Sequence, residues 1–299
     1  MRDNLAGMTQ TGRFSITVPA TSANLGPGFD TLGIAVALPL RVEATESDTD
    51  RFLYEGEGSL PDTPKNLMHQ GFALVCRELG LEPVPVEFRV NSSIPLARGL
   101  GSSSAALVAG AAAADALTGN RLGRDGVFQI CARAEGHPDN VAPAVFGGFT
   151  ASAATDQGFV TRSLPLPAAW RFLFAVPEFE LPTMTARKLV PDSYSRSDTV
   201  FTSSRTALWT LAVATEDASL LAIACQDVMH EPQRMPMLPG FQEAVSRAEA
   251  AGAHGTFLSG AGPTLAAICA SDTVDAVSEA LAGYGRVLEL PGSPGYRIT

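Results

Sequence analysis

In the first half of the chain, apolar residues recur at every second position in some segments and at every third or fourth position in others. Strict alternation over "FSITV" at residues 14–18 predicts a strand. Pro19 ends this strand, and an irregular loop leads to the next apolar strand within "ATSANLGPGFDTLGIAVAL". Spacings of three to four predict helices. The remaining predictions in this half are, in order, a short strand in "DRFLYEGEG", a helix in "PKNLMHQGFALVCRELG" that stops near Gly80, a strand in "PVEFRVNSSIP", and helices over 102–117 and 124–134.

The second half opens with its own strand, "RFLFAVP", after a predicted loop in "DQGFVTRSLPLPAAW". Further elements are helices in "SDTVFTSSRTALWTLAVA", "DASLLAIACQDVMH" and "FQEAVSRAEAAG", a strand, glycine turn and strand in "HGTFLSGAGPTLAAICA", a helix in "DTVDAVSEALAGY", and strands in "GRVLEL" and "GYRIT". This order predicts an α+β fold without internal repeats. The 299-residue length favours two lobes, residues 1–165 and 166–299.

Composition and charge narrow the class of partner. Apolar residues make up 45% of the chain and charged residues 17%, as in ordinary soluble globular proteins. The net charge of −10 would repel nucleic acid and anionic lipid, so neither is an expected partner. A small anion can still be held where local dipoles or a metal ion outweigh this screened field.

Cysteine usage and the N-terminal stretch indicate the compartment. The four cysteines are scattered without a metal-binding spacing, which predicts reduced core thiols. "MRDNLAGMTQTGRF" has no apolar signal-peptide core, and no apolar run is long enough to cross a membrane. We therefore expect a cytoplasmic protein.

Two glycines and three serines stand directly before the predicted helix at residue 102, in "PLARGLGSSSAALVAG". The first N–H groups of a helix lack partners inside the helix, and its dipole favours an anion at that end. Gly99 and Gly101 would let the backbone approach phosphate oxygens, and the serines would add hydroxyl groups. The same string also fits a serine-capped helix with a tight entry turn.

Neither common nucleotide-binding motif is present. There is no GxxxxGK[ST], and the glycine spacing differs from the dinucleotide GxGxxG. A serine hydrolase is disfavoured because GxSxG is missing and no histidine with an acidic partner marks a relay nearby. If a phosphate binds here, the lysine of an ordinary phosphate loop has been replaced by other groups.

Three segments together resemble the motifs of the GHMP kinases. "PLARGLGSSSAA" is similar to the central motif of that family, "VPATSANLGPGFDTLG" to the first, and "FLSGAGPTLAAI" to the third. With "EGHPDNVAPAVFGGF", "DVMHEPQR" and "GYRIT", the chain resembles the branch that phosphorylates the side-chain hydroxyl of L-homoserine for threonine biosynthesis. The resemblance covers nearly the whole chain.

The resemblance implies a fold and a place for ATP. The N-terminal domain would be like ribosomal protein S5 domain 2 and the C-terminal domain ferredoxin-like, with the active site between them. Asn66 would lie close to the adenine base, or would only cap a helix. The expected phosphate-binding residues are Pro95, Leu96, Ala97, Arg98, Gly99, Leu100, Gly101, Ser102, Ser103, Ser104 and Ala105.

Phosphoryl transfer from ATP needs charge neutralisation, usually by Mg²⁺ on oxygen ligands. Glu135 is the expected carboxylate ligand, with the hydroxyl of Ser103 (or Ser102) as its partner. The alternative for Glu135 is a solvated charge at a helix end. With a metal ion and the helix dipole in place, the missing lysine is not needed.

The resemblance also assigns the groups around the amino-acid substrate. Arg187 and Arg234 would grip its carboxylate, since a planar guanidinium can bind a carboxylate through two hydrogen bonds. The ammonium group would meet Asp30 and Asn24. A turn that contains Ser259 and Gly260 would close over the substrate.

Three residues of "GHPDN" would surround the acceptor hydroxyl. Asp139 and Asn140 would lie beside it, with Asp139 as an orienting residue or a weak base. His137 would hold this loop or touch the substrate. The alternatives for the chain as a whole are another GHMP small-molecule kinase and a non-catalytic nucleotide or amino-acid sensor. Dimers are common among the relatives that the resemblance implies, so a homodimer is one possible state, and the sequence does not fix it.

Overall fold

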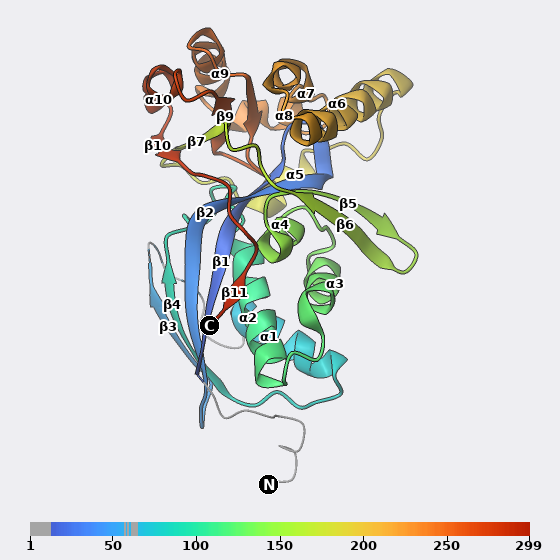
Figure 1. The fold of residues 1–299 in the computed structure, drawn as a ribbon, viewed down its shortest axis with the longest axis vertical. Coiled ribbons are helices and arrows are strands. Elements are labelled where there is room, and N and C mark those ends of the chain that lie inside the picture. The colour runs from blue at the N-terminus through green and yellow to red at the C-terminus, as the bar shows by residue number, and fades with distance from the viewer. Residues whose placement is uncertain (1–12, 57, 59, 61–64) are drawn as a thin grey trace.

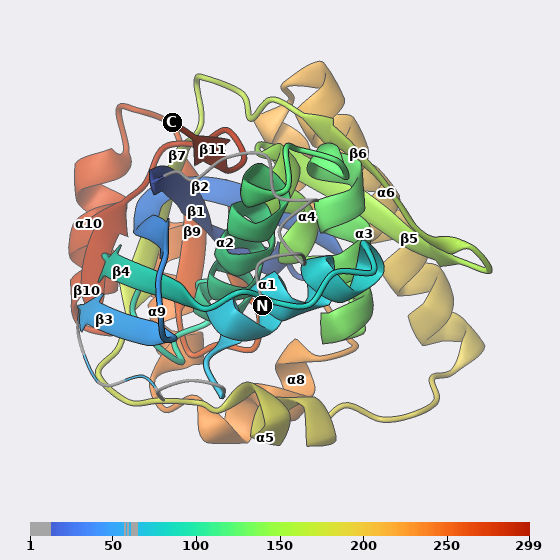
Figure 2. The same ribbon diagram turned by 90° about the horizontal axis from the view of Figure 1, so that it is seen from below.

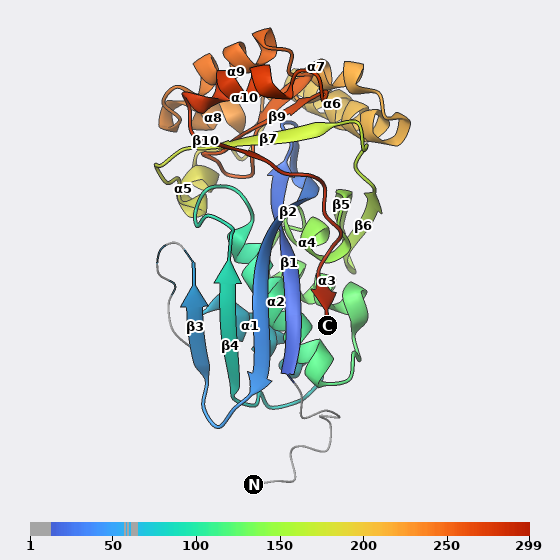
Figure 3. The ribbon, with the colours of Figure 1, turned by 60° about the vertical axis from the view of Figure 1, so that its left-hand side comes forward.

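Two β-sheets stacked along the long axis of the molecule form the framework. The computed structural model describes residues 13–56, 58, 60 and 65–299 (Figure 1). A seven-stranded sheet forms the lower layer and a four-stranded sheet the upper layer, and helices cover the outer face of the upper sheet (Figure 3). This confirms the predicted α+β class.

The lower sheet is mixed and carries its helices on one face. Its strand order is β11-β1-β2-β4-β3, and the hairpin β5–β6 joins it through β2. Helices α1, α2, α3 and α4 pack against it, as the view from below shows (Figure 2). The elements are β1 (Arg13–Asn24), β2 (Gly28–Glu46), β3 (Arg51–Glu55), α1 (Leu67–Glu78), β4 (Val86–Ser92), α2 (Ser102–Leu117), α3 (Gly123–Glu135), α4 (Val141–Phe146), β5 (Phe149–Thr155), β6 (Gly158–Leu164) and β11 (Arg297–Ile298).

The upper sheet has the order β10-β7-β9-β8 and is antiparallel throughout. Its sequence of strand, helices, two strands, helix and strand is the ferredoxin-like arrangement that the family resemblance implied. A second apolar cluster lies between this sheet and its helices. The elements are β7 (Arg171–Val176), α5 (Thr183–Lys188), α6 (Arg196–Thr215), η2 (Ala218–Leu220), α7 (Leu221–Ala224), α8 (Glu231–Arg234), η3 (Met235–Met237), α9 (Phe241–Ala250), β8 (Gly255–Leu258), β9 (Leu265–Cys269), α10 (Val274–Ala282) and β10 (Arg286–Glu289).

The prediction of an irregular loop after Pro19 is wrong. Strand β1 continues to Asn24, β2 begins at Gly28, and the two form one long hairpin. Register shifts between Pro19 and Ala20, and between Ala23 and Asn24, absorb the proline and the tight turn. Small buried residues on both strands hid the alternation that marks a half-buried strand.

Two further predictions are wrong for local reasons. The predicted loop over 156–170 contains β6, which pairs along its whole length with β5. The single helix predicted over 217–230 is broken: α7 ends at Ala224, and a new turn begins where the Asp227 carboxylate accepts hydrogen bonds from the N–H groups of Met229, His230 and Glu231. A side chain that caps a new helix start competes with continuation of the old helix.

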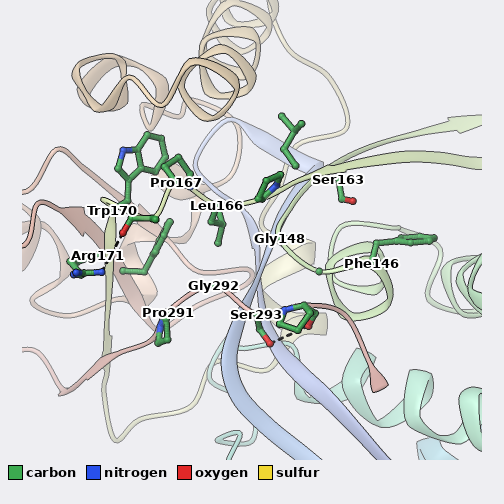
Figure 4. A pocket seen from close by; sticks show the side chains of 16 residues that line it. Phe146, Gly148, Ser163, Leu166, Pro167, Trp170, Arg171, Pro291, Gly292 and Ser293 are labelled. Atoms are coloured by element: carbon green, nitrogen blue, oxygen red, sulfur yellow. Dashed lines mark hydrogen bonds between the residues drawn. The ribbon is translucent and has the colours of Figure 1, made fainter. Parts of the chain in front are cut away.

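The chain crosses between the two layers twice. It passes upward between β6 and β7, and residues 290–296 bring it back so that β11 pairs with β1, at Ile16 opposite Ile298. Backbone hydrogen bonds from Ala37 to Pro291 and from Gly148 to Ser293 hold the returning segment. A hollow of about 560 Å³ lies between the two crossovers, lined by Leu166, Trp170 and Gly292 among others (Figure 4). None of the predicted site residues lines it.

Among the described residues, no helix combines the length and the apolar character needed to cross a membrane.

Helices α1 and α2 approach each other closely because each presents a glycine. A Cβ on Gly110 of α2 would collide with the carbonyl of Met68, and one on Gly71 of α1 would collide with the carbonyl of Leu107. Both obstacles are backbone atoms, which cannot rotate away as a flexible side chain could. Close packing of these helices places the start of α2 against the sheet.

We expect Gly110→Ala to destabilise the protein. Alanine gains about 1 kcal/mol over glycine in a helix interior, but overpacking against a backbone carbonyl only 1.9 Å away falls in the upper part of the usual range, about 2–3 kcal/mol. The net effect should be a loss of about 1–2 kcal/mol in the free energy of unfolding, measured by urea denaturation. An unchanged or higher stability would show that the two helices separate without cost.

Candidate active site

The glycine and serine loop before α2 lies where the two layers meet. Gly101 is the N-cap of α2, in the left-handed conformation with φ 69°, and no side chain caps the helix. The serine-capped alternative is therefore wrong: within the described part of the chain, no side chain accepts from the first N–H groups of α2. The carbonyl of Leu100 accepts a hydrogen bond from the Thr21 N–H, which fixes the loop to β1.

Glycine is required at both glycine positions of the loop. Gly99 has φ 76°, and a Cβ there would collide with the carbonyl of Ser259 in the upper layer. A Cβ on Gly101 would collide with the hydroxyl of Thr21. The loop is thus threaded between β1 and the turn that joins β8 to β9.

The three serines differ in environment. Ser102 is half-buried, Ser103 is exposed, and Ser104 is buried. Ser104 donates a hydrogen bond of 2.8 Å to the Glu135 carboxylate. The structure therefore brings Ser104 to Glu135, where the sequence had suggested Ser103 or Ser102.

Arg98 ties the loop to the upper layer. Its guanidinium donates to the carbonyls of Pro177 and Glu178, and it lies 3.1 Å from the Glu180 carboxylate. These groups all lie in the segment after β7. Of the remaining loop residues, Pro95, Leu100 and Ala105 are buried, and Leu96 and Ala97 are half-buried.

The carboxyl group of Glu135 lies where burial disfavours its charged form. Burial raises its pKa to about 7, although the Ser104 hydrogen bond and the positive His137 lower it in part. Its carboxylate and the neighbouring serine hydroxyls are oxygen donors, the set that Mg²⁺ prefers. The residues present therefore fit a divalent cation, which would supply the positive charge that this carboxylate lacks.

The "GHPDN" segment forms a hydrogen-bonded turn beside Glu135. His137 Nδ1 lies 2.6 Å from Asp139 Oδ1, and the same oxygen accepts from the Asn140 N–H at 3.0 Å. Burial alone would lower the pKa of His137, but the hydrogen bond and charge of Asp139 outweigh it and raise the pKa to about 9. Thr21 Oγ1 donates to Asn140 Oδ1, so the turn is fixed to β1 as well.

Asp30 and Arg187 pair directly. The guanidinium of Arg187, on α5, makes two hydrogen bonds to the Asp30 carboxylate, one of 3.1 Å and a second from Nη2 to Oδ2. Ligand atoms of Asp30, His137 and Asp139 all lie within 4.8 Å of one another. The predicted ammonium site and the predicted hydroxyl site are therefore adjacent.

Two guanidinium groups lie near one aromatic ring. The Cζ atoms of Arg187 and Arg234 are 5.4 and 5.7 Å from the centroid of Phe29. Arg234 is only 2% exposed, and burial together with the charge of Arg187 lowers its pKa to about 10. Arg234 therefore stays cationic at neutral pH, and two guanidinium groups in one corner of the site suit an anion.

The turn after β8 meets the tip of the first hairpin. Asn24 Nδ2 donates to the Gly260 carbonyl at 2.9 Å, and the Gly260 N–H donates to Ala23. Ser259 is fully buried, where it shares a hydrogen bond of 2.7 Å with Ser22 and donates to the carbonyl of Gly99. Thus Ser259 and Gly260 close the site by holding its parts together.

Asn66 caps α1. Its side-chain oxygen accepts from the Met68 N–H at 2.9 Å, which confirms the capping alternative. Its approach to adenine stays a prediction.

Several residues of this site were not found from the sequence. Thr21 fixes both the glycine loop and the "GHPDN" turn, and Phe29 lies beside both arginines. His230 contacts Arg234, and Asp227 caps the turn that carries both. All four residues lie in quoted motifs, Thr21 and Phe29 in "VPATSANLGPGFDTLG" and Asp227 and His230 in "DVMHEPQR", and that was the available signal. No local pattern marks the tertiary contacts through which they act.

The chain matches two family profiles. "GHMP kinases N terminal domain" covers residues 66–148, and "GHMP kinases C terminal" covers residues 211–287. The first match contains the glycine and serine loop, and the second contains Arg234 and the closing turn. The chain therefore belongs to the GHMP kinases, which are ATP-dependent enzymes.

Individual relatives narrow this class. The homoserine kinase of Thermus thermophilus is 50% identical over 283 residues, 93% of this chain and 96% of that protein. The homoserine kinase of Moorella thermoacetica is 42% identical over 85% of this chain and 86% of its own length. The crystal structure of homoserine kinase from Cytophaga hutchinsonii matches with a TM-score of 0.87 at 28% identity, over 97% of this chain and 98% of that one. Within the GHMP kinases, the chain is a member of the homoserine kinase family.

The raised pKa of Glu135 predicts that removing its charge stabilises the ligand-free protein. An unfolded carboxyl titrates near pH 4.5 and the folded one near pH 7, so ionisation costs stability progressively as the pH rises from 4.5 to 7. Glu135→Gln should therefore raise the free energy of unfolding at pH 8 by up to about 3 kcal/mol, and the melting temperature should rise with it. At pH 4.5 both should be nearly unchanged.

The matched control is Glu279→Gln, which removes an exposed carboxylate from α10 and should not change this pH dependence. Differential scanning calorimetry at several pH values measures both variants. A Glu135→Gln protein that is less stable than the wild type at pH 8 would contradict the environment described.

Proposed function

We propose that this kinase transfers the γ-phosphoryl group of ATP to the side-chain hydroxyl of L-homoserine, giving O-phospho-L-homoserine for threonine biosynthesis. The observation that carries the proposal is the cluster around Phe29: two guanidinium groups, one carboxylate, and the Asp139 turn within reach of that carboxylate. Homoserine carries an anion, a cation and a hydroxyl on one short chain. The cluster offers guanidinium groups for the anion, the Asp30 carboxylate for the cation, and the Asp139 turn for the hydroxyl.

Charge balance explains why an α-amino acid suits this site. Without substrate, Arg187 and Asp30 satisfy each other. A zwitterion can replace both partners together, its carboxylate on Arg187 and its ammonium on Asp30, and leaves no charge unpaired. A substrate with a carboxylate but no ammonium group would leave Asp30 without a cationic partner, and an unpaired charge in a closed site is costly.

The start of α2 supports ATP binding over residues 95–105. Its free N–H groups and positive dipole end favour phosphate oxygens. Glu135 with the serine hydroxyls would hold Mg²⁺, which supplies positive charge to the phosphates of bound ATP. Asn66, at the start of α1, would approach the base.

Asp139 is proposed to orient the acceptor hydroxyl. Its Oδ1 already accepts from His137 and from the Asn140 N–H, and within the described part of the chain Oδ2 accepts no hydrogen bond. Oδ2 is thus available to the hydroxyl. His137 holds Asp139 in place, and a loose phosphoryl-transfer transition state asks for little early deprotonation.

The direct test is substrate preference. ADP release should be far faster with homoserine than with mevalonate, galactose or shikimate, and chelation of divalent cations should abolish it until Mg²⁺ is restored. Phosphorus NMR identifies the product as a phosphate monoester of the side-chain hydroxyl. A clear preference for one of the other acceptors would refute the proposed substrate.

The charge argument predicts discrimination against 4-hydroxybutyrate, which has the carboxylate and hydroxyl but no ammonium. Its kcat/KM should be lower by about 10-fold or more, as expected when a half-buried charge loses its partner. In Asp30→Asn the penalty should shrink, because a neutral amide needs no cation. Equal use of both acceptors by the wild type would contradict the role given to Asp30.

A further inference from the structure

His230 lies between Arg234 and the tip of the first hairpin. Its side chain is fully buried, at the turn before α8. Nδ1 lies 2.9 Å from Arg234 Nη1, and Nε2 lies 2.8 Å from the Gly26 carbonyl oxygen. The imidazole therefore connects a substrate-binding arginine to the turn that leads from Asn24 to Asp30.

The chemistry of these contacts fixes one tautomer. A guanidinium can only donate, so Nδ1 must accept and carries no proton. The Gly26 carbonyl can only accept, so Nε2 carries the proton and donates. Burial also holds the pKa of His230 well below its ordinary value, which agrees with a neutral ring beside a cation.

The remaining contacts of Arg234 leave one edge for a ligand. Nη1 donates to His230 and to the Gly260 carbonyl at 2.9 Å, and Nε lies 3.4 Å from the Ala186 carbonyl oxygen. Nη2 donates no hydrogen bond to any residue that the structure describes. Nη2 is therefore the nitrogen left for a ligand, on a guanidinium whose Cζ lies 5.7 Å from the centroid of Phe29.

The position of His230 is itself enforced. Asp227 accepts hydrogen bonds from the N–H groups of His230 and Glu231, and the Glu231 carboxylate accepts from the Leu258 N–H of β8. The ring also lies 5.5 Å from that of Phe29. Such anchoring on several sides is what a residue that positions another side chain requires.

We propose that His230 is a positioning residue for the substrate carboxylate: its Nδ1 holds the Arg234 guanidinium in the orientation that binds homoserine. This inference rests on the proposed function, because it takes Arg234 to bind the carboxylate of homoserine. It adds that the acceptor at Nδ1, rather than the bulk of the ring, is the required feature.

Two conservative variants separate the two contacts of the ring. The amide oxygen of His230→Asn falls near the position of Nδ1 and can accept from Arg234, while the contact to Gly26 is lost. The amide nitrogen of His230→Gln falls near the position of Nε2 and can donate to Gly26, while the acceptor for Arg234 is lost. We expect His230→Gln to raise the KM for homoserine about 10-fold or more, and His230→Asn about 3-fold or less. The KM for ATP should stay unchanged in both.

Leu281→Ala is the control for a purely structural effect. Leu281 is fully buried in the second apolar cluster, on α10, which packs mainly against α9, β7, β9 and β10. This variant should lower the melting temperature without changing the KM for homoserine. If His230→Gln does not fold, His230→Asn decides alone: a preserved KM supports the inference, and a 10-fold rise overturns it.

A double-mutant cycle with Arg234→Met isolates the route of action. If His230 acts through Arg234, His230→Gln should add nothing to the KM for homoserine once Arg234 is replaced. Additive effects of the two substitutions would overturn the inference, and so would equal effects of the Gln and Asn variants. In either case, homoserine phosphorylation by the wild type would still uphold the proposed function. A wild type that does not phosphorylate homoserine would overturn both.

Discussion

The tip of the β1–β2 hairpin is the constraint on which the whole site depends. β1 and β2 stay paired in the lower sheet up to Asn24 and Gly28, and at this end Ala23, Asn24 and Gly26 all hydrogen-bond to residues from the second half of the chain. A few residues earlier, Thr21 holds both the glycine loop and the Asn140 side chain. One hairpin therefore sets the glycine and serine loop, the "GHPDN" turn and the turn after β8 relative to each other. A shift of its register would displace all three at once.

The site gathers positive groups in a protein whose net charge is negative. A protein with net charge −10 holds two guanidinium groups around Phe29 and an uncapped helix start nearby. Each cation is matched by an acceptor inside the fold, Asp30 for Arg187 and neutral oxygen or nitrogen atoms for Arg234. Glu135 is the opposite case, an acid whose pKa is raised chiefly by burial. The charges of the binding region are therefore set by a few close contacts and not by the net charge of the molecule.

Much of this arrangement could be predicted from the sequence, because glycine, serine and charged residues in motifs carry local signals. The central helix, the glycine loop and most strands follow from periodicity and turn residues. The pairing of Glu135 with Ser104 could not be predicted, since the choice among three consecutive serines depends on the angle at which α3 meets α2. The role of Arg98 could not be predicted either, because its hydrogen-bond partners lie about eighty residues later in the chain. Sequence patterns indicate which residues have unusual chemistry, and packing decides which of them meet.

The pairing of β11 with β1 makes the lower layer depend on both ends of the described chain. A fragment that stopped at the first crossover would leave the outer edge of β1 without its partner around Ile16. Open strand edges recruit other strands, so such a fragment would be prone to self-association. Contacts this distant in sequence also form late, because closing so large a loop is entropically unfavourable. The two halves are therefore better regarded as one cooperative folding unit than as separable modules.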